Sequence, residues 1–213
     1  MKTYLTCLLL LPLAAVAGDF INLTFDNPIL TGSLTPIVPG GPYRGSTGDL
    51  LPGWTVKANG KLLSTLIYSP PLTSSGTPVT VRENTAAQAA TPLGKFSLYL
   101  DGSPPPFELT GPEIRLSQTG TIPTDAAALR LASGYVQVFA NGDKIGEINP
   151  VTGPFTIDVA RLAGQTVNLE FLVRPGDSIR FDILGFTTVP EPSTYALFGL
   201  GAALLWYHRR RCR

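Results

Sequence analysis

Few side chains in the central part of this chain of 213 residues are suited to catalysis. The only histidine is His208, and the two cysteines are Cys7 and Cys212, so all three lie close to an end of the chain. The central part therefore lacks the commonest general base, the commonest transition-metal ligand, and any thiolate or disulfide. Catalysis there would depend on carboxylates, hydroxyl groups or lysines.

The motifs of common catalytic sites are also missing from the sequence. It contains no Gly-x-Ser-x-Gly, His-Glu-x-x-His or Gly-x-x-x-x-Gly-Lys pattern. We therefore expect a protein that is not an enzyme and holds no cofactor. A hydrolase that uses a pair of carboxylates is the alternative, because the spatial separation that such a pair needs cannot be read from the sequence.

Three aromatic residues are candidates for stacking on a sugar ring. Tyr43 lies in a segment rich in glycine and proline, Tyr68 precedes Ser69-Pro70, and Trp54 follows Pro52-Gly53. A tryptophan that enters a strand after Pro-Gly usually packs in the core, so we favour a core position for Trp54. For both tyrosines the alternative is an ordinary surface residue.

The first 17 residues have the pattern of a secretory signal peptide. Lys2 precedes an apolar stretch from Leu5 to Val16, and Ala15 and Ala17 form a small-x-small cleavage site. We expect a signal helix that is removed by cleavage after Ala17.

The last 25 residues, from Val189 to Arg213, carry a second kind of address. Pro190, Glu191 and Pro192 place a carboxylate in a stiff extended segment, Tyr195 to Tyr207 is uncharged, and the chain then ends in an arginine cluster. This order predicts a transmembrane helix whose arginines stay in the cytoplasm. As a helix the uncharged stretch spans about 20 Å against a hydrocarbon core of about 30 Å, so flanking residues must help it to cross. The arginines of the membrane stop are Arg209, Arg210 and Arg211.

This C-terminal pattern resembles the PEP-CTERM sorting signal. The resemblance rests on Pro190-Glu191-Pro192, the following Ser193-Thr194, the glycine-rich apolar segment and the arginines. It implies a Gram-negative bacterial protein that is exported, anchored in the inner membrane, and cut near the Pro-Glu-Pro motif by an exosortase, a membrane protease. The cargo then reaches the cell surface or an extracellular polysaccharide matrix. The signal covers about an eighth of the chain.

Residues 18–188 remain as the folded body. Of the 16 Lys and Arg, 11 belong to it once Lys2 and four tail arginines are set aside, and of the 15 Asp and Glu, 14 belong to it without Glu191, a net charge near −3. A mildly acidic body argues against nucleic acid as a partner. Its length suits one domain.

The pattern along the body predicts an all-β fold, an antiparallel β-sandwich with roughly nine or ten strands. We expect a first strand over Phe20 to Phe25, a long loop with at most one short strand over residues 29–51, and hairpin turns at Asn59-Gly60 and Asn141-Gly142. A helical turn over residues 160–165 should end at a glycine. Further strands are expected at Trp54 to Val56 and over residues 66–68, 95–100, 113–118, 135–139, 144–148, 155–159, 166–173 and 179–184, with a weak strand over residues 79–81.

The body also resembles galactose-binding-like jelly rolls found among carbohydrate-binding modules. The resemblance rests on the order of Asn22 to Asp26, Leu51 to Trp54, Asp158 to Thr166 and Phe181 to Ile183. It implies a polysaccharide ligand, and a structural calcium near Asp26 and Asp182. The alternatives are a capping role for Asp26, a solvated Asp182, and a structural or adhesion module with no sugar ligand.

Overall fold

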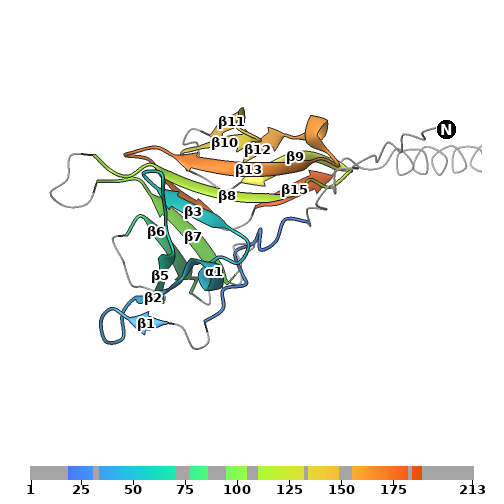
Figure 1. Cartoon of the computed structure of the whole chain (residues 1–213). Helices are drawn as coiled ribbons and strands as arrows, with labels where there is room; N and C mark the ends of the chain where they lie inside the picture. The colour runs from blue at the N-terminus through green and yellow to red at the C-terminus, as the bar shows by residue number, and fades with distance from the viewer. Residues whose placement is uncertain are drawn as a thin grey trace, which may run out of the picture.

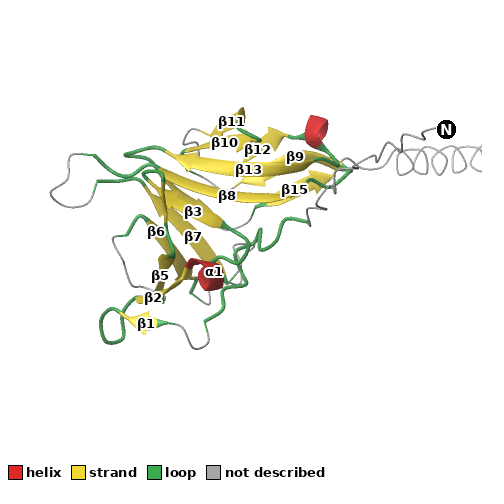
Figure 2. Cartoon of the chain, in the orientation of Figure 1, coloured by secondary structure: helices red, strands yellow, loops and turns green. Residues whose placement is uncertain are grey.

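The body of the chain is built almost entirely of β-strands (Figures 1 and 2). The structure, a computed structural model, describes residues 19–30, 34–70, 77–85, 95–104, 110–131, 134–148, 155–181 and 184–188. The predicted signal peptide and sorting segment lie outside these ranges, as does Asp182. Within them, helix is limited to the single turn α1 (Thr47–Leu50) and a 3-10 turn, η1 (Ala160–Leu162).

The first sheet has six antiparallel strands, and its two longest strands lie side by side near its middle. β8 (Ile114–Thr121) and β13 (Thr166–Val173) pair along their whole lengths, and Figure 1 shows them running across the molecule. Their residues alternate between the core and the outer face, which is why the sequence pattern found them. The order is β11-β10-β13-β8-β3-β4, with β3 (Thr55–Ala58), β4 (Lys61–Leu62), β10 (Val136–Ala140) and β11 (Asp143–Ile148).

Two further sheets pack against the same hydrophobic core. An isolated β-bridge joins Gly134, just before β10, to Ile179, which belongs to the larger of these two sheets. The larger sheet has the order β1-β2-β5-β6-β7-β14 and the smaller one β12-β9-β15. Their strands are β1 (Thr35–Pro36), β2 (Tyr43–Ser46), β5 (Thr65–Ser69), β6 (Val79–Glu83), β7 (Phe96–Asp101), β9 (Ala126–Leu131), β12 (Phe155–Asp158), β14 (Ser178–Phe181) and β15 (Gly185–Thr188).

An aromatic cluster joins the layers at the centre of the core. Phe25 packs against Trp54 with ring centroids 5.7 Å apart, and Phe171 of β13 packs edge-on against Phe181 of β14 at 5.2 Å. Phe25 also contacts Phe181, and Trp54 contacts Phe171, so each ring in the cluster touches two others. Rings from the N-terminal turn, from the segment at β3 and from the consecutive strands β13 and β14 therefore hold the sheets together.

The expected first strand is wrong. The backbone of Asn22 and Phe25 has positive φ values, 53° and 58°, so the chain turns where a strand was predicted. Gln118 binds both the backbone N–H and the carbonyl of Ile21, at 3.1 Å each. These long-range contacts, together with burial of Phe25, override the local alternation of apolar residues.

Most of the other elements agree with the sequence, with two differences. Both Asn-Gly hairpins are confirmed, and the turn after residue 160 ends at Gly164, whose φ is +74°. The expected loop over residues 29–51 instead contains β1, β2 and α1, which begins after Ser46 as its N-cap. In the described ranges the strands pair antiparallel, as expected, except that β5 and β6 pair in parallel.

Candidate functional site

Tyr43 and Tyr68 are brought together, but they do not form an open binding surface. They lie opposite each other in β2 and β5, with ring centroids 6.1 Å apart. Tyr68 is 6 % exposed, and its hydroxyl donates a hydrogen bond to Glu83 Oε2 at 2.6 Å. Burial, and then this hydrogen bond, raise the pKa of the Tyr68 phenol above its ordinary value. The Tyr68 ring and hydroxyl are both occupied within the protein, and half-buried Tyr43 packs against that ring.

Trp54 is a core residue, the position that the sequence favours. Its side chain is 5 % exposed, and its indole N–H donates to the carbonyl of Asn22 at 3.3 Å. With Phe25 and Phe171 against it, the ring has no free face for a sugar.

Asp26 stabilises the start of β7. Its Oδ1 atom accepts hydrogen bonds from the backbone N–H groups of Lys95, at 2.7 Å, and Phe96, at 3.0 Å. Among the described residues, no three carboxylates, histidines or cysteines lie close enough together to hold a metal ion, and Asp182 is outside those residues. A calcium site that uses Asp26 and Asp182 stays a prediction.

A hollow of about 110 Å³ opens at one end of the first sheet. It lies where β10 begins and where β11 and β13 end, beside the turn that leads to β14. Tyr135 stands at this hollow with 38 % of its surface exposed. We call it the Tyr135 hollow; its lining residues are Tyr135, Val136, Gln137, Glu147, Ile148, Leu172, Arg174 and Asp177.

The polar side chains of the Tyr135 hollow hold one another in place. Gln137 and Glu147 are directly opposite in β10 and β11, and Glu147 accepts hydrogen bonds from Lys144 and Arg174, one at each carboxylate oxygen. With its amide turned to suit these donors, Gln137 accepts from Lys144 Nζ at 3.2 Å. The Lys144 hydrogen bond is the main reason that the pKa of the Glu147 carboxyl lies below its ordinary value. Glu147 is therefore a fixed, ionised acceptor.

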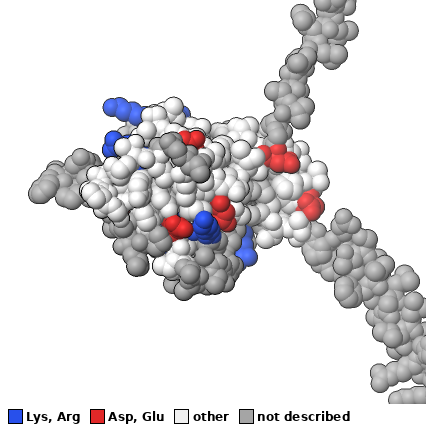
Figure 3. Space-filling view, turned by 90° about the horizontal axis from the view of Figure 1, so that it is seen from below, with Lys and Arg blue, Asp and Glu red and all other residues white. Residues whose placement is uncertain are grey.

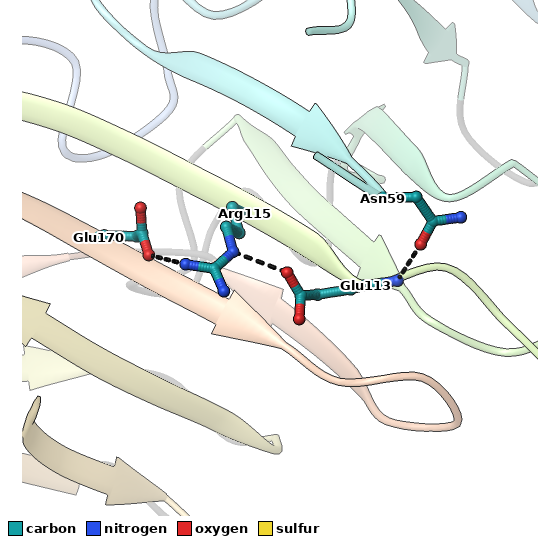
Figure 4. Close-up of polar contacts among 4 residues, drawn as sticks. All are labelled: Asn59, Glu113, Arg115 and Glu170. Atoms are coloured by element: carbon teal, nitrogen blue, oxygen red, sulfur yellow. Dashed lines mark hydrogen bonds and ion pairs between the residues drawn. The ribbon is translucent and has the colours of Figure 1, made fainter. Parts of the chain in front are cut away.

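The outer face of the first sheet continues this polar surface beyond the hollow. Gln137 of β10 lies opposite Leu172 of β13, which lies opposite Arg115 of β8. Arg115 donates to Glu113 at 2.7 Å and to Glu170 at 2.6 Å, and the hydrogen bond to Glu113 is the main cause of its raised pKa (Figure 4). The hairpin residue Asn59 accepts from the backbone N–H of Glu113 at 2.9 Å. These ion pairs leave the outer face around Arg115 polar, with almost no net charge.

Large clusters of one charge are not seen on the described part of the face in Figure 3, where basic and acidic residues are few and scattered. Phosphate chains bind clustered cations, and the absence of nucleic acid as a partner stays a prediction.

Sequence reasoning missed the Tyr135 hollow. The sequence predicts only that Tyr135 begins a strand and that Arg174 and Asp177 lie in the connection between the strands 166–173 and 179–184. Residue types alone do not show that this turn lies beside the hairpin. One signal in the sequence could have found it. Tyr135 lies two residues before Gln137 on the first strand of the Asn141-Gly142 hairpin, and residues two apart in a strand share a face of the sheet.

The sequence-predicted sorting and cleavage residues are outside the described part of the chain. They are Ala15, Ala17, Pro190, Glu191, Pro192, Arg209, Arg210 and Arg211. The predicted membrane segment, Tyr195 to Tyr207, also lies outside it. Within the described ranges, none of the helices has the length and apolar character needed to cross a bilayer.

Comparison with known proteins identifies the C-terminal segment. Residues 188–211 match the PEP-CTERM protein-sorting motif, so the chain carries this signal, which exosortase, a membrane protease, recognises. No curated protein matches the sequence.

Three solved structures are similar to the body at low identity. TmCBM61, a carbohydrate-binding module determined in complex with β-1,4-galactotriose, is 15 % identical over 81 % of this chain and 99 % of its own, with a TM-score of 0.36. A β-D-glucuronidase of Dictyoglomus thermophilum is 13 % identical over 66 % of this chain and 21 % of its own, with a TM-score of 0.33. The GH31 α-xylosidase of Xanthomonas citri is 12 % identical over 75 % of this chain and 16 % of its own, with a TM-score of 0.32. The chain thus spans about a fifth or less of either enzyme.

Proposed function

We propose that this protein is exported, processed through its PEP-CTERM signal, and then binds a polysaccharide of the cell envelope or extracellular matrix without cleaving it. In this proposal the body is a galactose-binding-like jelly roll, and the Tyr135 hollow is its binding site. The observation that carries the binding half is an exposed tyrosine ring beside polar side chains that are already fixed by ion pairs.

This combination suits sugar chemistry. A pyranose ring offers an apolar face of C–H groups, which packs on an aromatic ring such as that of Tyr135, and a rim of hydroxyl groups. Gln137, Asp177 and the Glu147 network supply acceptors and donors at that rim. Because Glu147 is held by Lys144 and Arg174 before any ligand arrives, binding would order few side chains and lose little conformational entropy.

The state of Glu147 supports a binding role rather than hydrolysis. A glycosidase needs one carboxyl with a raised pKa to protonate the leaving oxygen. The pKa of the Glu147 carboxyl is shifted the other way, chiefly by the hydrogen bond from Lys144. Such a carboxylate orients hydroxyl groups and does not supply a proton at neutral pH.

The sorting half of the proposal uses the C-terminal chemistry. Glu191 sits between prolines that disfavour helix and keep the segment extended, which suits recognition by a protease. The uncharged segment behind it enters the inner membrane and the arginines remain in the cytoplasm. Processing by exosortase frees the body from the membrane.

Glycan binding tests the Tyr135 hollow directly. The protein released by its native host is applied to a glycan array. The dissociation constant for the polysaccharide that binds most tightly is then measured for wild type, Tyr135→Ala and Tyr43→Ala. Loss of one stacked ring costs about 1.4 kcal/mol, so we expect the Kd to rise about tenfold for Tyr135→Ala. Tyr43→Ala is the matched control and should bind as wild type does.

Three results would count against this assignment. Equal loss in both variants would mean that the hollow is not the site. Absence of binding to any glycan would favour a structural or adhesion module, and turnover of a glycan would favour the hydrolase.

The sorting half has its own test. Glu191→Ala should leave the protein in the membrane fraction of the native host, whereas wild type should appear in the extracellular fraction as a shorter product by mass spectrometry. Release of Glu191→Ala at the wild-type rate would contradict processing through this motif.

A further inference from the structure

The last strand of the fold runs directly into the sorting motif. The motif match begins at Thr188, which is also the last residue of β15 and pairs with Ala126 of β9. Pro190 follows only two residues later. An extended chain advances at most about 3.6 Å per residue, so Glu191 lies within about 11 Å of a residue that belongs to the folded sheet. A protease that acts at this motif must therefore bind the chain immediately next to the folded body.

β15 is also an edge strand with little of its surface buried. Among strands of four or more residues in the described ranges, it is the one with no buried residue. It pairs on one side only, with β9, and its register shifts between Thr187 and Thr188. Apart from the ladder, the Phe186 ring packs against the edge of the core and against Phe20, with ring centroids 5.8 Å apart, and Thr187 Oγ1 donates a hydrogen bond to the Ala128 carbonyl at 3.3 Å. Strands with so little buried area open without global unfolding.

We propose that β15 leaves β9 and is bound by the processing protease as the upstream part of its peptide substrate. This inference rests on the proposed function, in which the motif is cut near Pro190-Glu191-Pro192. Proteins commonly bind extended peptides through the peptide's backbone N–H and C=O groups, by adding it as a strand to a sheet. The backbone groups of Thr187 and Thr188 that pair with β9 cannot pair with a protease at the same time. Detachment of β15 therefore precedes cleavage.

The location of β15 allows this step without loss of the fold. The central aromatic cluster comes from Phe25, Trp54, Phe171 and Phe181, none of which is in β15. β9 keeps its other neighbour, β12, when β15 departs. The sheet thus gives up an edge strand and the packing of Phe186, while the central aromatic cluster and the Tyr135 hollow remain.

A removable cross-link tests the proposal. Thr187 and Ala128 are directly opposite in β15 and β9, and such pairs lie at a Cα separation that a disulfide can span. The body has no cysteine of its own, so the pair Thr187→Cys/Ala128→Cys introduces the only disulfide within it. In the native host, we expect the oxidised full-length chain to stay in the membrane fraction, and a reductant to restore release.

Matched variants separate detachment from general effects of a cross-link. Asn168 and Thr119 are opposite in β13 and β8, far from the motif in the sequence, and Asn168→Cys/Thr119→Cys should be released normally when oxidised. Each single cysteine variant of the β15 pair should also be released. A Gly-Ser spacer inserted after Thr188 should restore release of the oxidised β15 pair, because the protease then has free chain to bind.

The outcomes distinguish this inference from the proposed function. If the oxidised β15 pair is released at the wild-type rate while Glu191→Ala is retained, the motif is processed but detachment is not needed. If Glu191→Ala is released as well, processing through the motif fails and the inference fails with it.

Discussion

At the scale of single residues, the side chains of the body limit the chemistry that is open to it. The positions of His208, Cys7 and Cys212 remove imidazole and thiol chemistry from the body whatever the fold. The choice among aromatic residues needed the structure, because burial of Tyr68 depends on Tyr43 and Phe96, which lie elsewhere in the chain. Trp54 was correctly favoured for the core because Pro52-Gly53 marks its entry into a strand.

Glu147 gives a prediction at this scale about pH. Its pKa is lower in the folded protein, so its ion pairs stabilise the fold above the ordinary Glu pKa of about 4.3. That contribution disappears as the pH falls through the lower, folded pKa. We expect wild type to have a higher urea midpoint than Glu147→Gln at pH 7, and the difference to vanish in strong acid.

The comparison has a built-in check. Both variants lose stability in acid through other carboxylates, so only the difference between them reports on Glu147. A difference that is constant across the pH range would mean that the Lys144 and Arg174 contacts contribute through packing rather than through charge.

At the scale of elements, the sequence predicted features that depend on neighbouring residues and missed features that depend on contacts between distant parts of the chain. Both Asn-Gly turns were predictable because positive φ values at two successive residues are a local requirement, met by Asn59-Gly60 and Asn141-Gly142. The false strand at Phe20 to Phe25 has good local alternation, but Gln118 and Trp54 bind its backbone from far along the chain. The parallel pairing of β5 with β6 likewise cannot be predicted from a short stretch of sequence, because it depends on how two separate segments meet.

A glycine substitution measures the local requirement at the β10–β11 turn. Gly142 has φ +88°, and an added Cβ would meet no atom within 4 Å, so Gly142→Ala changes backbone strain alone. We expect a loss of about 1 kcal/mol in the free energy of unfolding, measured by urea denaturation. Gly48 in α1 has equally open surroundings and no positive φ, so Gly48→Ala should be neutral or slightly stabilising. Equal effects in the two variants would contradict this account.

At the scale of the whole molecule, one core serves all three sheets, and both proposed sites lie at its periphery. Phe171 of the first sheet and Phe181 of the second meet at the same aromatic cluster as Trp54. The Tyr135 hollow lies at a sheet end and β15 at a sheet edge. The sequence predicted the all-β class from alternation and turns, but it could not place the sheets against each other, because no residue pattern states which inner faces meet.

This arrangement predicts two levels of stability in the released protein. Trp54 packs against Phe171 of the first sheet and against Phe25, which in turn contacts Phe181 of the second sheet. The other tryptophan, Trp206, follows the Pro190-Glu191-Pro192 cleavage region, so fluorescence of the released chain reports on the shared core. We expect its urea transition to coincide with that of far-UV circular dichroism, as for one cooperative unit. In hydrogen exchange, the amides of β15 should exchange by a local opening that low urea does not change, while amides of β8 and β13 should follow global unfolding. If the amides of β15 are as protected from exchange as those of β13, then β15 does not open locally. That result would remove the basis for proposing that the protease binds β15 as a detached strand.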